Sequence, residues 1–60
     1  MKLAVIRANA LFSFYCAERR AGTPPLEANL LMNEYAKRLD ARSPFEIEQD
    51  AMQQIRENMS

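Results

Sequence analysis

The sequence predicts an all-α protein of three short helices, over residues 3–21, 24–41 and 44–58. In each of these segments apolar residues recur every three or four positions, which is the spacing of one helix face. The single glycine and the three prolines fall at the two breaks between the segments, where these residue types end and begin helices. Sixty residues suffice for one domain. We therefore expect a single small helical domain over residues 1–60, with a helical hairpin packed on an N-terminal apolar helix and completed by self-association.

The first segment is apolar on two faces. At 100° per residue one side carries Leu3, Ile6, Ala10, Phe14 and Ala17. The roughly opposite side carries Val5, Phe12, Tyr15 and Cys16. A helix of this kind requires cover on both sides, and sixty residues cannot surround a central helix. A second copy of the chain is the simplest way to cover the second face.

A hairpin is the alternative for the same segment. Residues 2–7 and 11–16 are rich in residue types that suit strands, and residues 8–10 would form the turn. That turn lacks the glycine that favours tight hairpins. The alanines at positions 4, 8, 10 and 17 favour a helix instead.

The first break contains signals that end one helix and begin the next. Gly22 stands where a helix commonly ends in a left-handed residue, and prolines follow at once. Thr23 is the expected N-cap of the second helix, with Pro24 at its first helical position, where a missing N–H has no cost.

The second break carries the most specific local signal in the chain. Ser43 and Glu46 have the spacing of a capping box, in which each side chain binds the backbone N–H of the other residue. Pro44 stands between them at the expected first position of the third helix.

Composition excludes several functional classes. Eight Lys and Arg balance eight Asp and Glu, whereas a dedicated phosphate-backbone binder is usually basic. One cysteine precludes an internal disulfide, and with no histidine a structural zinc site is not expected. We expect no metal or cofactor. No apolar run reaches the length of a membrane-spanning helix, and a single thiol fits the reducing cytoplasm.

A chain this small buries only about 60% of its unfolded surface when it folds, so its own stability is marginal. We therefore expect self-association to supply the missing stability. The residues expected to carry it lie on the first helix: Leu3, Arg7, Leu11, Phe14 and Glu18. In a two-fold antiparallel pairing, Arg7 of one chain would meet Glu18 of the other.

A second set of candidates is basic and would contact nucleic acid: Arg19, Arg20, Lys37, Arg38 and Arg42. These residues close the first and second helices, where cations also compensate the helix dipole. In a helix-turn-helix protein the recognition helix places its contacts near its N-terminus, whereas the second helix here is basic only at its far end.

Catalytic chemistry finds little support. Cys16 has no histidine to act as its base, and a buried apolar role suits it better. Glu46, Glu48 and Asp50 occupy the first turns of a helix, where acidic residues are expected for the dipole.

The sequence therefore predicts a small non-enzymatic regulatory or adaptor protein that binds a protein partner through a helical surface, as a homo-oligomer. The alternative is a dimeric nucleic-acid-binding regulator that uses the arginines at its helix ends. In size and composition the chain resembles small bacterial or phage regulators, a likeness that no motif carries.

Overall fold

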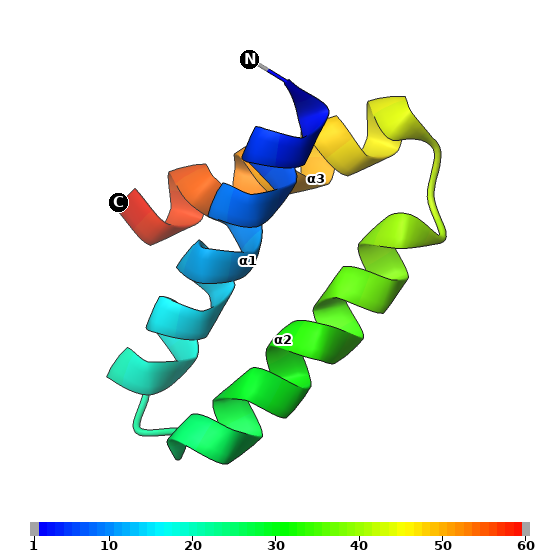
Figure 1. The fold of residues 1–60 in the computed structure, drawn as a ribbon. Coiled ribbons are helices and arrows are strands. Elements are labelled where there is room, and N and C mark those ends of the chain that lie inside the picture. The colour runs from blue at the N-terminus through cyan, green and yellow to red at the C-terminus, as the bar shows by residue number, and fades with distance from the viewer. Residues whose placement is uncertain (1, 60) are drawn as a thin grey trace.

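The computed structural model describes residues 2–59, which form three helices joined by short turns (Figure 1). They are α1 (Leu3–Arg20), α2 (Pro25–Asp40) and α3 (Pro44–Met59). The three-helix prediction is confirmed. The hairpin alternative for residues 2–16 is wrong, because this part of the chain is one continuous helix.

Helix α1 is the centre of the packing. It packs most extensively against α3 and also against α2, whereas α2 and α3 touch each other only slightly. Figure 1 shows α2 running back alongside α1 from the first turn, and α3 crossing α1 near its N-terminal half. The result is a flat molecule of 31 × 24 × 14 Å, in which one helix is covered from two directions.

The first turn ends α1 in a Schellman motif. Gly22 has a positive φ of 97°, the left-handed conformation predicted for it. The N–H of Thr23 donates to the carbonyl of Glu18 at 3.0 Å. The N–H of Gly22 donates to the carbonyl of Arg19 at 3.1 Å. These bonds satisfy carbonyl groups that the end of the helix leaves without partners.

The start of α2 corrects one prediction. Pro24 is the N-cap and Pro25 the first helical residue, so Thr23 does not cap this helix. A residue that precedes proline is kept out of the helical region, and Pro24 accordingly stays extended at ψ 151°. The hydroxyl of Thr23 donates instead to the carboxylate of Glu18, at 3.0 Å.

The second turn contains the predicted capping box. The N–H of Glu46 donates to Oγ of Ser43 at 3.3 Å, and the N–H of Ser43 donates to Oε1 of Glu46 at 3.4 Å. Helix α3 begins at Pro44, as expected. Hydrogen bonds from Ser43 and Arg42 lower the pKa of Glu46 below its ordinary value of 4.5.

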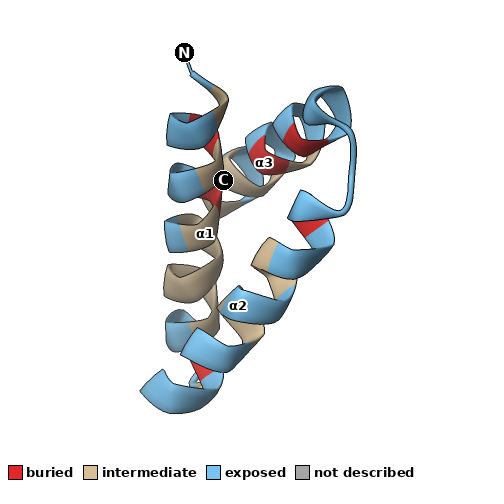
Figure 2. Ribbon diagram, turned by 45° about the vertical axis from the view of Figure 1, so that its right-hand side comes forward, coloured by how far each residue is buried: buried red, intermediate tan, exposed pale blue. Residues whose placement is uncertain are grey.

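The core is small and half of it is alanine. Its buried apolar residues are Ile6, Ala10, Ala28, Leu39, Ile47 and Ala51. Figure 2 shows the buried residues as separate short bands, on an α1 that is largely half-buried and on an α2 and α3 that are largely exposed. The accessible surface is 4326 Å², whereas a compact monomer of this mass is expected to expose about 4,000 Å². The two values are close, and the small core follows instead from the three alanines among the six buried apolar residues described.

Candidate interaction surface

Among the described residues, six large apolar side chains are exposed, whereas only three, those of Ile6, Leu39 and Ile47, are buried. Those exposed are Val5, Phe12, Leu26, Leu30, Phe45 and Met52. Single exposed apolar residues are normal on protein surfaces, but exposed residues that share a face indicate a site of interaction. Two such groups lie on α1 and on α2.

The outer face of α1 is uncharged along most of its length. By helical spacing its members lie opposite the buried side of the helix: Ala4, Val5, Ala8, Asn9, Phe12 and Cys16. Arg7 is the only charged residue between positions 3 and 17, and it turns toward α2. The Phe12 side chain is 67% exposed on this face.

An open hollow of about 320 Å³ adjoins this face, where α1 faces α2. Phe12 and Tyr15 line it from α1, and Asn29 and Met32 line it from α2. Three of these four side chains are aromatic or aliphatic, and none is charged. The hollow therefore suits an apolar group, with polar contacts available from the amide of Asn29 and the hydroxyl of Tyr15.

The outer face of α2 begins with a leucine pair. Leu26 and Leu30 are one turn apart, so they lie on the same side of the helix, and their side chains are 79% and 63% exposed. Asn33 and Lys37 continue the same face toward the C-terminus of α2. This arrangement offers two apolar anchors at the start of the helix and a polar continuation.

Of the residues expected to mediate self-association, Arg7 and Phe14 contact α2. Phe14 stacks on Tyr35 with ring centroids 4.9 Å apart and planes at 18°. Glu18 accepts the hydrogen bond from Thr23, while Leu3 and Leu11 are half-buried. An Arg7–Glu18 pair between two copies stays a prediction, and in this structure Glu18 already has a partner within the chain.

Arg7 itself is paired within the chain. Its Nε donates to Oδ1 of Asp40 at 2.8 Å, and its Nη2 donates to Oδ2 of Asp40 at 2.9 Å. These two bonds hold the pKa of Asp40 below its ordinary value of 3.8, because they stabilise the ionised carboxylate. The same bonds raise the pKa of Arg7, because they stabilise its protonated guanidinium.

The five basic candidates do not form one patch. Two close α1 and the others lie at the C-terminal end of α2, at opposite ends of that helix in Figure 1. Arg19 donates to the carbonyl of Thr23 at 2.7 Å. Arg42 binds Glu46 at 3.3 Å and also binds Asp50. Arg20, Lys37 and Arg38 are exposed.

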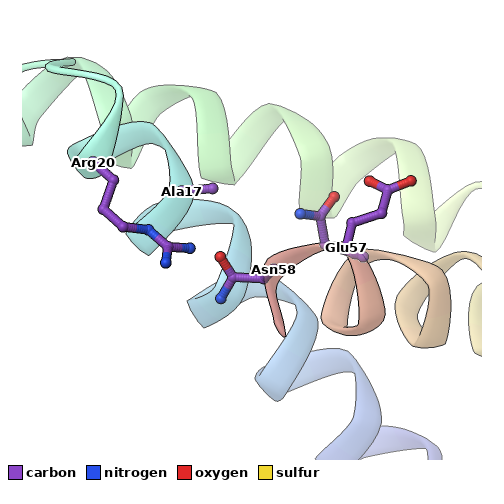
Figure 3. A pocket seen from close by; sticks show the side chains of 5 residues that line it. Ala17, Arg20, Glu57 and Asn58 are labelled. Atoms are coloured by element: carbon purple, nitrogen blue, oxygen red, sulfur yellow. The ribbon is translucent and has the colours of Figure 1, made fainter. Parts of the chain in front are cut away.

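A second, polar hollow of about 320 Å³ lies between α1 and the end of α3 (Figure 3). Its lining residues are Ala17, Arg20, Gln54, Glu57 and Asn58. The Oδ1 atom of Asn58 is buried without a hydrogen-bond partner in the described structure. In Figure 3 the guanidinium of Arg20 and the amide of Asn58 turn toward one another across this hollow.

The residues considered for catalysis have structural surroundings. Glu46 and Asp50 both bind Arg42, while Glu48 is exposed and Cys16 is a half-buried free thiol. Among residues 2–59, no three Cys, Asp or Glu side chains are grouped as a metal site would require. None of the helices in that range has the length and apolarity needed to cross a membrane.

Sequence reasoning missed three residues that organise the structure: Tyr35 as a stacking partner, Asp40, and Arg42 as the centre of an ion-pair cluster. The spacing of Arg42 and Glu46, four residues apart, was a usable signal for one of these contacts. No local pattern connects Arg7 with Asp40, which is 33 positions away.

No protein-family model, curated protein or solved structure matches this chain.

Proposed function

We propose that this chain is a non-enzymatic regulatory or adaptor protein of the cytoplasm that works as a homo-oligomer and binds a protein partner through a helical surface. The observation that carries the proposal is the paired exposure of Leu26 and Leu30 on α2, in a chain whose described residues include only six that are buried and apolar. Keeping two neighbouring leucines in water forgoes about 1.5–3 kcal/mol of burial for each side chain. A partner that covers both leucines would recover that free energy.

The chemistry of the α2 face indicates the kind of partner. Apolar anchors at positions i and i+4 are how an amphipathic helix engages an apolar groove on another protein. Leu26 and Leu30 would fill such a groove, and Asn33 and Lys37 would lie at its polar rim.

The test is affinity purification of the tagged full-length chain, followed by identification of the proteins it retains. Replacing Leu26 and Leu30 with glutamine preserves helix propensity and removes the anchors. We expect at least one protein to be retained by the unmodified chain, lost from the double variant and kept by a Phe45→Gln control, because Phe45 is exposed on α3, away from this face. Equal recovery with all three chains would overturn the proposal, provided that circular dichroism shows the same helix content.

The basic residues favour this proposal over a nucleic-acid-binding function. They are divided between two ends of the molecule, and Arg19 and Arg42 already have partners within the chain. A nucleic-acid regulator would be retained on duplex DNA at low salt and would be released steeply as the salt concentration rises. We expect no such retention from this electrically balanced chain.

A further inference from the structure

We propose that the outer face of α1 is a self-association surface, on which a second copy of this chain docks across a two-fold axis and each copy places Phe12 in the hollow of the other. The inference rests on the homo-oligomer part of the proposed function and assigns it a surface. That surface differs from the set expected from the sequence, whose Arg7, Phe14 and Glu18 contact partners within the chain.

The first argument is that a protruding side chain and a recess of matching chemistry lie side by side. Phe12 protrudes from α1 and also lines the hollow of about 320 Å³ together with Tyr15, Asn29 and Met32. A two-fold axis beside Phe12 brings each ring to the other copy's hollow, because a two-fold interface uses the same patch twice. The chain therefore supplies both halves of the contact, whereas a different protein would have to supply its own apolar group.

The second argument is electrostatic. The chain has no net charge at neutral pH, and the outer face of α1 has no charged side chain from Ala4 to Cys16. Two copies therefore approach without repulsion, and a strongly acidic or basic partner gains no attraction on this face. The basic residues Lys2 and Arg19 lie at the two ends of α1, and helices that cross at the common angle of about 50° keep their ends apart.

The third argument concerns size. Helix α1 has 18 residues and therefore extends about 27 Å. Ala4 and Ala8 are exposed on its outer face, and such small side chains let a second helix approach closely. A stable interface needs about 800 Å² from each partner, which is about a fifth of the 4326 Å² that the chain exposes. Covering this face would complete a fold that has a small core.

The test is the mass of the full-length chain by light scattering over a wide dilution range. Phe12→Gln removes the protruding ring, and Ala8→Glu places a carboxylate at the centre of the face without disturbing helix propensity. Both positions are exposed, so both variants should fold. Phe45→Gln is the matched control, because that ring is 71% exposed but lies on α3.

We expect the unmodified chain and Phe45→Gln to be dimers with equal dissociation constants. Each face variant should raise the constant by at least about a hundredfold, since the two-fold axis removes the contact twice. A chain that is monomeric at every concentration overturns the inference, as does a dimer that Phe12→Gln and Ala8→Glu leave unchanged. A monomeric chain would also overturn the homo-oligomer part of the proposed function, whereas a dimer that the face variants leave unchanged would overturn only the surface assigned here. Partner retention through Leu26 and Leu30 is a separate readout, so partner binding can fail or succeed independently of self-association.

Discussion

Arg7 near the start of α1 and Asp40 at the last residue of α2 form a two-pronged ion pair, with N–O distances of 2.8 and 2.9 Å. The pair fastens the C-terminal end of α2 to α1, whereas the Gly22 turn fastens the other end of α2. A guanidinium that binds both oxygens of one carboxylate fixes orientation as well as distance. The angle between α1 and α2 is therefore constrained at both ends of α2.

We predict that Asp40→Asn lowers the melting temperature by a few degrees at most, because exposed ion pairs contribute little in water. Thermal unfolding followed by circular dichroism, at low and high salt, measures the effect. The loss should shrink at high salt, where the native pair is screened. In a double-mutant cycle, Arg7→Gln should lower the melting temperature less in the Asp40→Asn background than in the unmodified chain, because the ion pair is already lost there. If the two losses were strictly additive, the pair would not couple the helices.

We predict that Tyr35 ionises above its ordinary pKa of 10.0, because burial and the nearby carboxylates of Asp50 and Glu57 disfavour the phenolate. The unfolded chain then loses this proton at lower pH than the folded chain does. The resulting stability is fully present below pH 10 and falls as pH rises through the folded-state pKa. Ultraviolet titration of a Tyr15→Phe variant, which leaves Tyr35 as the single tyrosine, measures the shift. Ionisation at or below pH 10 would contradict the packing of this ring.

We predict that Leu39→Ala costs about 2–5 kcal/mol of unfolding free energy. Leu39 is the only large side chain in the described structure that is fully buried, at 1% exposure. Because a domain this small has little stability to lose, the variant should be largely unfolded at neutral pH. Leu30→Ala is the matched control, and its effect should stay within about 0.5 kcal/mol because Leu30 is exposed. Urea unfolding compares the two, and similar losses would contradict the position of the core.

We predict that Ser43→Ala costs about 1 kcal/mol, the usual effect of removing an N-cap hydroxyl. The substitution also removes two of the hydrogen bonds that lower the pKa of Glu46 or tie it to the cap. The pKa of Glu46, followed by the carboxyl resonance in a pH titration, should therefore rise toward its ordinary value of 4.5 in the variant. Ser43→Asp, which retains a capping oxygen, should preserve the stability of α3. If the chains with serine, alanine and aspartate at position 43 had the same unfolding free energy, the cap would contribute nothing to stability.

Local signals were sufficient for the helices and their ends. Gly22 predicted the left-handed residue after α1, and Ser43 with Glu46 predicted the capping box of α3. These features form between residues a few positions apart, so the neighbouring sequence contains everything that they need. The one local error, Thr23 as an N-cap, arose because two successive prolines move the start of α2 from Pro24 to Pro25.

The sequence by itself determined three helices, their turns and the presence of two apolar faces on the first helix, because periodicity and capping are local properties. The tertiary structure decided which neighbour each face meets: Arg7 and Phe14 face α2, while Phe12 faces outward. It also decided that the basic residues gather at two separate ends. Periodicity shows which residues share a side of a helix, but it does not show which neighbouring helix that side contacts. The pairing depends on crossing angles and on contacts between residues tens of positions apart, such as Arg7 with Asp40.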